Sequence, residues 1–371
     1  MTDQNRPAAS VAAETGAAPV AAPVAFGLHT FGDVTVDAEG RRRTYAQTIR
    51  DIVDVAVLAD ELGIDAFGVG EHHRDDYAVS SPETVLAGIA TRTERILLAS
   101  AVTVLSSDDP VRAFERFSTV DALSNGRAEA IMGRGSFTES FPLFGYDLRD
   151  YEKLFDEKHE LWLRLLREES VTWKGTTRAP LTDVTVYPRL ESGTMRSWRA
   201  VGGSPQSVVD AARQRVPLML AIIGGAAQRF APFAGLYREA LERTGADPLP
   251  VGIHSPGHIA DTDEEAMAQL WPHYEASHLR IGAERGWGPV TKGQFRNEVE
   301  HGSLYVGAPE TVARRIADAI IALDADRFDL KYANGQLPHE RLMRSIELYG
   351  TRVVPRVKEL LADAGHRAAI A

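Results

Sequence analysis

The 371-residue chain contains no cysteine. That absence excludes disulfides, thiolate metal sites, cysteine nucleophiles and iron–sulfur clusters. It also lacks any apolar run near the roughly 20 residues needed to cross a bilayer, so we expect no transmembrane segment. Any chemistry must therefore use other side chains or a cofactor.

An excess of basic residues is absent as well. The 41 Lys and Arg residues are outnumbered by 52 Asp and Glu residues, which gives a formal net charge of -11. Partners such as nucleic acid or an anionic membrane need a basic face, so we expect neither. Because the sequence also has no clear export signal, we expect a cytoplasmic location.

The first 23 residues are rich in Ala, Pro and Val and show no Leu-rich core, which predicts a flexible tail. No linker or shift in composition divides the remainder. We therefore expect residues 24–371 to form a single domain.

From residue 25 onward, short β-branched runs alternate with longer segments of helical period, a pattern typical of βαβ units and a parallel sheet. The predicted strands are Ala25–His29, Asp65–Gly70, Ile96–Thr103, Ala128–Met132, Trp198–Gly202, Pro217–Ile223, Leu249–His254 and Arg327–Lys331. Eight strands with interleaved helices are what a (β/α)₈ TIM barrel requires. The alternative is an open doubly wound sheet, but no GxGxxG turn follows the first strand. Two long segments, 171–197 and 282–306, are expected to be loops that close over the face carrying the site. For 282–306, a solvated surface insert or part of a dimer interface is the alternative.

Active sites of such barrels lie where the strands end, and ionisable residues gather after the second strand, in Glu71 to Asp76. His72 or His73 could act there as acid or base. A metal site is one alternative, although no further spacing completes a ligand shell, and simple capping of the strand is another. Adjacent residues of an extended chain point to opposite sides, so only one histidine is expected to face the barrel mouth.

Two other strand ends suit an anion. After the fourth strand, Gly133-Arg134-Gly135 offers backbone amides and a guanidinium, and after the fifth, Gly202-Gly203-Ser204 leads into a helix N-terminus. An ordinary glycine turn with a Ser cap explains the second motif equally simply. Small residues from Ser100 to Val102 would let a flat ring lie against the backbone, or are plain strand core.

Together these blocks resemble the bacterial luciferase-like, flavin-dependent monooxygenases, a family of (β/α)₈ barrels. The most specific matches are Gly70-Glu71-His72-His73, the stretch from Ser81-Pro82 to Ile96, Asp121 to Arg127 and Gly133-Arg134-Gly135, in that order along the chain. The resemblance implies FMN, or in some branches a deazaflavin, at the barrel mouth. It also implies that reduced flavin and O₂ place one oxygen atom on a small organic substrate.

The resemblance further assigns roles residue by residue. Arg134 with Gly135, and Gly203-Ser204 with Ser207, would hold the cofactor phosphate. Ala101–Val102 falls where the family often has a non-proline cis peptide beneath the flavin ring. His72 matches the histidine that assists oxygen chemistry, and Ile222 would lie near the ring. Gly133 replaces a cysteine of the luciferases, so no role of that thiol carries over.

Because no dinucleotide motif is visible, reduced FMN is expected from a separate NAD(P)H-dependent flavin reductase. The family also suggests a homodimer. Two other functions fit the same residues: a deazaflavin-dependent hydride-transfer oxidoreductase, and a flavin-binding barrel without turnover. The substrate itself is not indicated by any motif.

Overall fold

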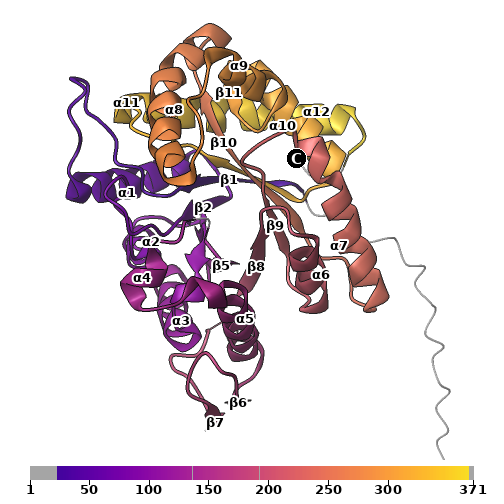
Figure 1. Ribbon diagram of the computed structural model, residues 1–371. Helices are drawn as coiled ribbons and strands as arrows, with labels where there is room; N and C mark the ends of the chain where they lie inside the picture. Colours follow the sequence, from indigo (N-terminus) through magenta and orange to yellow (C-terminus); the bar gives the residue numbers. More distant parts are fainter. Residues whose placement is uncertain (1–22, 136, 192, 367–371) are drawn as a thin grey trace, which may run out of the picture.

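The computed structural model describes residues 23–135, 137–191 and 193–366, so the predicted tail, apart from Pro23, lies outside the described residues. Eight parallel strands close into a barrel (Figure 1). They are β1 Ala25–Thr30, β2 Ala66–Val69, β3 Leu97–Ser100, β5 Ala128–Gly133, β8 Arg196–Val201, β9 Leu218–Ala221, β10 Val251–Ile259 and β12 Arg327–Lys331. Each pairs with its neighbour in the order β1, β2, β3, β5, β8, β9, β10, β12, and β12 returns to β1. The predicted TIM barrel is therefore confirmed.

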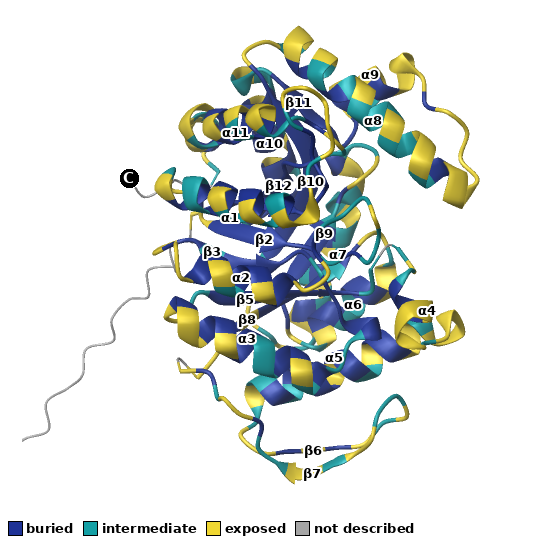
Figure 2. Ribbon diagram, turned by 90° about the vertical axis from the view of Figure 1, so that its left-hand side faces the viewer, coloured by how far each residue is buried: buried dark blue, intermediate teal, exposed yellow. Residues whose placement is uncertain are grey.

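Helices surround this barrel. Their bounds are α1 Tyr45–Glu61, α2 Pro82–Ala90, α3 Pro110–Ser124, α4 Ser140–Phe144, α5 Tyr151–Arg167, α6 Pro205–Arg213, α7 Ala231–Arg243, α8 Asp263–Arg285, α9 Lys292–His301, α10 Pro309–Leu323, α11 His339–Leu348 and α12 Val354–Asp363. The helices that pack on the strands, such as α1, α3 and α10, have buried inner faces and exposed outer faces, whereas α8 and α9 are more exposed (Figure 2). Among the described residues, no helix is long and apolar enough to cross a membrane.

A column of charged groups runs inside the barrel from its base toward its mouth. At the base, Arg327 Nε donates to Asp329 Oδ1 at 2.8 Å, and the same guanidinium pairs with Glu129 of β5. Asp329 lies 3.1 Å from His29 Nε2. Burial opposes the charge on Asp329, but Arg327 and His29 outweigh that effect and hold its pKa well below its ordinary value. The column therefore places a buried carboxylate and a histidine beneath the mouth of the barrel.

The prediction of two long loops over the site is wrong for 171–197. For 282–306 the predicted place is right, because the segment lies over the barrel mouth, but its predicted loop structure is wrong. Most of 282–306 is helical, because α8 continues to Arg285 and α9 starts at Lys292. A capping box marks that start: Thr291 Oγ1 accepts from the Gln294 amide, and Gln294 Oε1 accepts from the Thr291 amide at 2.8 Å. This signal was present in the sequence.

The other segment, 171–197, contains a short antiparallel hairpin of β6 Val171–Trp173 and β7 Leu181–Val184. It connects α5 to β8 and therefore reaches the N-terminal end of a strand, opposite the face expected to carry the site. Figure 1 shows this hairpin beyond α5 at the far end of the molecule.

One buried carboxylate joins the end of α1 to the start of β3. Asp60 accepts hydrogen bonds from the backbone amides of Glu94, Arg95 and Ile96 at 2.9, 3.1 and 2.8 Å. Burial raises the pKa of Asp60, but these three bonds outweigh it, and the pKa lies below its ordinary value of 3.8.

We expect Asp60→Asn to lower the free energy of unfolding by about 1–3 kcal/mol at pH 7, because a neutral amide accepts these bonds less well. A depressed pKa contributes stability above the unfolded value and loses it as pH falls through the folded value. The difference between wild type and variant should therefore shrink below about pH 4, as measured by urea unfolding. A constant difference from pH 7 to pH 3 would contradict this account.

Candidate active site

A cavity of about 280 Å³ opens at the carboxyl ends of the strands. Its polar lining is His29, Glu71, His72, His73, Arg134, Glu139, Ser140, Tyr151 and His254, and its other lining residues include Phe31, Ala101, Val102, Val104, Ile131, Gly133, Gly135, Phe137, Gly202, Met219 and Ile223. Five of the site residues predicted from the sequence line this cavity: His72, Ala101, Val102, Arg134 and Gly135.

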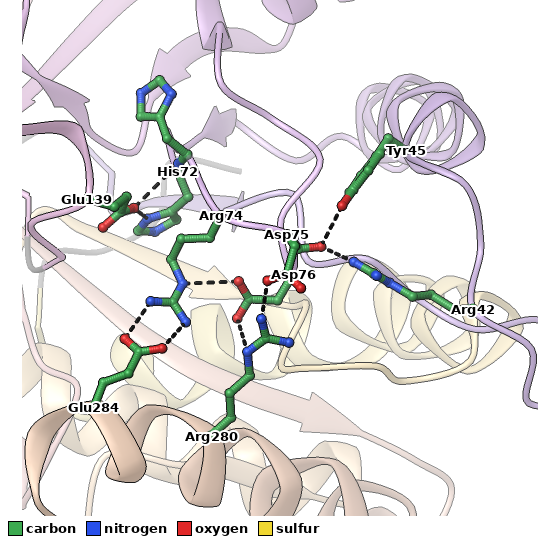
Figure 3. A network of polar contacts seen from close by, with 10 residues as sticks. Arg42, Tyr45, His72, Arg74, Asp75, Asp76, Glu139, Arg280 and Glu284 are labelled. Carbon is green, nitrogen blue, oxygen red and sulfur yellow. Dashed lines mark hydrogen bonds and ion pairs between the residues drawn. The ribbon is translucent and has the colours of Figure 1, made fainter. Parts of the chain in front are cut away.

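His72 is held in place on several sides. Its Nδ1 lies 3.2 Å from Glu139 Oε1 (Figure 3). Its ring packs against Tyr77 with the centroids 4.4 Å apart. The rings of Phe31 and Phe137 meet it edge-on at 5.2 and 5.0 Å. With Nδ1 on Glu139, Nε2 is the ring nitrogen that remains for a cofactor or substrate.

Glu139 was not predicted as a site residue, because it lies 67 positions away from His72 in a segment without a motif. Burial raises its pKa, but hydrogen bonds from His72 and from the His73 amide outweigh that effect, and the pKa is lowered. Glu139 is therefore a carboxylate at neutral pH and can hold His72 in one orientation and tautomer. Its Oε2 atom is buried without a hydrogen-bond partner in the structure.

His73 also lines the cavity, which corrects the prediction that only one of the two histidines faces the mouth. Strand β2 ends at Val69, so the alternation of an extended strand does not apply to residues 71–73. His73 Nε2 lies 2.8 Å from Glu71 Oε1, and Glu71 Oε2 accepts from the Val104 amide at 3.1 Å. Through Glu71, His73 is tied to the chain just beyond β3.

One wall of the cavity is formed by Ala101 and Val102, which are joined by a cis peptide bond, as the resemblance implied. A glycine lies against each of these residues. A Cβ on Gly70 would come within 2.7 Å of the Ala101 carbonyl oxygen, and a Cβ on Gly133 within 2.7 Å of Val102 Cγ2. Any side chain at 133 would therefore displace this wall, which is consistent with glycine in place of the cysteine found in luciferases.

The Arg134 side chain reaches the start of α6. Its Nη2 donates to Ser207 Oγ at 3.3 Å, its Nη1 pairs with Glu152 at 3.3 Å, and its guanidinium lies over the Tyr151 ring. Ser204 is the N-cap residue of α6 and accepts from the Ser207 amide at 3.3 Å. A cationic side chain, two hydroxyls and a helix N-terminus are thus brought to one place, which suits an anion.

The other predicted site residues do not line the cavity itself. Gly202 lines the cavity, whereas Gly203, Ser204 and Ser207 lie beside it and outside the lining. Ile222 is fully buried in the apolar core, and the next residue, Ile223, lines the cavity instead. Ile222 directly follows the last residue of β9. Adjacent side chains of an extended chain point to opposite sides, so the side chain of Ile222 enters the core and that of Ile223 faces the cavity.

The floor of the cavity contains a histidine pair that was not predicted from sequence. His29 Nδ1 lies 2.8 Å from His254 Nδ1, and the two rings stack with centroids 5.0 Å apart. Burial, reinforced by nearby His29 and partly opposed by Asp329, lowers the pKa of His254 to about 3. His254 is thus neutral at physiological pH. Both residues lie in predicted strands, and a histidine in a strand is more often a buried core residue than a site residue.

A larger space adjoins this cavity and is walled by α8, α9 and the segment between them. We call it the outer chamber. Its volume is about 980 Å³, and it shares Phe31, Phe137 and Ile223 with the inner cavity. Its other lining residues include Asp33, Tyr77, Tyr274, Ser277, His278, Ile281, Arg285, Trp287, Gly288, Gly293, Gln294, Asn297, Glu298 and Lys331.

Ion pairs fasten α8 to the loop that carries His72 (Figure 3). Arg74 donates to both carboxylate oxygens of Glu284 at 2.6 and 2.7 Å, and to Asp76 at 3.1 Å. Arg280 pairs with Asp75 and, at 3.4 Å, with Asp76. The wall of the outer chamber is therefore linked directly to the histidine loop.

We expect Glu284→Gln to loosen α8 without unfolding the protein. An ion pair with one half-exposed partner contributes up to about 1 kcal/mol, so its loss should raise the opening equilibrium of α8 up to about fivefold. Hydrogen–deuterium exchange of residues 278–291 measures this change, and high salt should reduce the difference. Asp54→Asn, which breaks the exposed Arg92 pair elsewhere, is the matched control. Equal exchange in both variants would show that the pair does not hold the helix.

The family model for luciferase-like monooxygenases matches residues 29–326. The chain belongs to this family. The N-acetyl-S-alkylcysteine monooxygenase of Bacillus subtilis is 29% identical over 250 residues, covering 66% of this chain and 67% of that protein. The alkanal monooxygenase alpha chain of Photorhabdus luminescens is 23% identical over 360 residues, covering 89% and 97%. The protein is accordingly an oxidoreductase of the monooxygenase type, as predicted.

Solved structures agree on the fold. Monooxygenase RslO1 from Streptomyces bottropensis superposes on this luciferase-like chain with a TM-score of 0.79 at 25% identity, covering 89% of this chain and 99% of that one. The oxygenating constituent of 3,6-diketocamphane monooxygenase from Pseudomonas putida, solved with FMN, gives 0.71 at 17% identity, covering 90% and 98%. The coenzyme F420 dependent tetrahydromethanopterin reductase from Methanopyrus kandleri gives 0.68 at 18%, covering 91% and 100%. The same fold thus serves two kinds of flavin cofactor.

The alternative role of the two adjacent histidines is a metal site. Among the described residues, no group of three or more His, Cys, Asp or Glu side chains could hold a metal ion. His72 and His73 each contact a separate carboxylate instead.

Proposed function

We propose that this luciferase-like protein is an FMN-dependent monooxygenase that places one oxygen atom from O₂ on an organic substrate. The observation that carries the proposal is the anion cradle of Arg134, Ser207 and the start of α6 beside a cavity walled by Ala101 and Val102. FMN combines a flat ring with a phosphate dianion, and the two parts of this site suit these two groups.

The residues present also fit a cofactor that reacts with oxygen. Bound reduced FMN supplies the electrons that activate O₂. His72 is positioned by Glu139 and can hold or donate a proton at Nε2. Phe31, Tyr77 and Phe137 surround its ring and exclude water from that side.

The source of reduced flavin is a separate part of the proposal. We saw no dinucleotide-binding motif in the sequence, so a separate NAD(P)H-dependent flavin reductase is proposed as the partner. A homodimer is proposed from the family alone. Substrate, O₂ and reduced FMN would all enter through the barrel mouth.

The experiment begins with the purified full-length protein. Mass spectrometry identifies any cofactor that copurifies with the protein. Titration with FMN and with a deazaflavin shows which of the two cofactors binds more tightly. Oxygen consumption with reduced FMN then tests turnover. FMN binding that changes the rate at which reduced FMN consumes O₂, relative to free reduced FMN, supports the proposal. Preference for the deazaflavin would favour a hydride-transfer oxidoreductase, and FMN binding that does not alter the reaction of reduced FMN with O₂ would favour a barrel without turnover.

A further inference from the structure

The outer chamber indicates which class of substrate this enzyme takes. We propose that it binds a bulky, uncharged substrate with fused or linked rings, whose reacting edge lies between Phe31, Phe137 and Ile223. This inference rests on the proposed function for the reaction, but the binding itself does not depend on FMN. Its support comes from the size, the aromatic lining and the charge balance of the chamber.

The size of the chamber is the first argument. Its volume of about 980 Å³ lies at the upper end of the roughly 300–1,000 Å³ typical of sites for drug-sized ligands. A short-chain aldehyde or ketone would leave most of this volume to water. Because Phe31, Phe137 and Ile223 line both spaces, a ligand in the chamber has one end at the mouth of the inner cavity.

Aromatic side chains are the second argument. Phe31, Tyr77 and Phe137 lie at the inner end of the chamber, and Tyr274 and Trp287 lie on the side formed by α8 and the segment after it. Rings at both ends favour offset-stacked or edge-to-face contacts with a planar ligand, each contributing about 0.5–1.5 kcal/mol beyond buried area. A flexible alkyl chain gains no such directional contact.

Charge balance is the third argument. Besides His278, whose ring contacts Tyr274 and Trp287, the chamber contains two acidic and two basic side chains, and each already has protein partners. Lys331 Nζ lies 3.2 Å from Asp33 Oδ2, and the Arg285 guanidinium lies over the Phe137 and Trp287 rings at 4.8 and 5.3 Å.

The fourth charged side chain, Glu298, accepts hydrogen bonds from the backbone amides of Gly225 and Ser303 at 3.4 and 3.2 Å. A carboxylate or sulfonate on the substrate would have to compete with Asp33 for Lys331, and the carboxylates of Asp33 and Glu298 would repel it, so its burial is costly. The neutral amides of Gln294 and Asn297 instead suit hydroxyl or carbonyl groups on a ring.

The test uses a neutral three-ring ketone, 9-fluorenone, its anionic analogue 9-fluorenone-2-carboxylate, and decanal. Binding to the full-length protein is measured by isothermal titration calorimetry, both without FMN and with saturating FMN. We expect 9-fluorenone to bind in both conditions and the carboxylate and decanal to bind at least tenfold more weakly. Displacement of 9-fluorenone by FMN would overturn the proposal, because it would place the ring in the inner cavity.

Gly293→Phe fills the chamber. Gly293 lines it from α9, and a Cβ there meets no atom closer than 3.8 Å. We expect this variant to weaken 9-fluorenone binding at least tenfold. Gly235→Phe is the matched control, because Gly235 lies in α7, outside the chamber, with no atom within 4 Å of an added Cβ.

A second pair on one helix keeps the test decisive if Gly293→Phe does not fold. Ile281→Ala should weaken binding, whereas Leu279→Ala, at an exposed position of α8, should not. Unchanged binding in Gly293→Phe and Ile281→Ala, or equally tight binding of the carboxylate, overturns the chamber proposal. FMN binding measured in the same samples tests the proposed function separately, so that either proposal can fail alone.

Discussion

His72→Ala should lower the rate of oxygen transfer to substrate by about 10²–10⁴-fold, the contribution typical of a placed acid or base. The structure gives the reason: Glu139 holds Nδ1 at 3.2 Å, and three aromatic rings fix the orientation of the imidazole. FMN affinity should change little, because the anion cradle lies on other elements. Product formation per O₂ consumed, with FMN binding measured in parallel, checks both statements.

The matched control is His73→Ala. His73 lines the same cavity, but its Nε2 is paired with Glu71 at 2.8 Å. Its loss should therefore disturb the contact of Glu71 with Val104 more than proton transfer. We expect the rate of oxygen transfer to decrease less than in His72→Ala. A large decrease in His73→Ala together with an unaffected His72→Ala would reverse the assignment. Glu139→Gln should give an intermediate decrease, because a neutral amide orients His72 less strongly.

Arg134→Ala should weaken FMN binding by about 10- to 150-fold and leave riboflavin binding nearly unchanged. Only FMN carries the phosphate, and a hydrogen bond to a charged group contributes about 1.5–3 kcal/mol. The Glu152 carboxylate that pairs with Arg134 is largely exposed, so an incoming phosphate can replace it at little cost. Fluorescence titration of both ligands measures the ratio.

Two variants make the phosphate test specific. Arg213→Ala removes the same charge from the last turn of α6, at an exposed position, and should leave FMN affinity unchanged. Arg134→Lys should recover part of the lost affinity, since it restores the charge without the planar donor geometry. If FMN and riboflavin weaken equally in Arg134→Ala, the guanidinium does not contact the phosphate.

The barrel and several of its strand-end residues were predictable because they depend on local pattern. Eight short, mainly apolar runs with intervening helical periods indicate the strands, and the order of a βα unit places every strand end on one face. His72, Ala101, Val102, Arg134 and Gly135 follow directly from that rule and from the motifs around them. The resemblance then gave them their expected chemistry.

Other features of the site could not be predicted from the sequence, because they are contacts between residues far apart in the chain. Glu139 reaches His72 across 67 positions, and His254 reaches His29 across 225. No periodicity or spacing signals such contacts, since only the closure of the barrel brings the elements together. Ile222 and Ile223 show the same limit at short range, because the direction of each side chain depends on where β9 ends.

Composition, periodicity and strand-end motifs identify an acidic, cysteine-free barrel with histidines, glycines and an arginine at its strand ends. Which of these residues share one cavity, and that α8 and α9 wall a larger chamber, became evident only in three dimensions. The same is true of the link from Arg74 to Glu284, which joins that wall to the histidine loop. The physical reason is that local periodicity records which face of an element is buried. The partner against which it is buried is set by packing among all the elements at once.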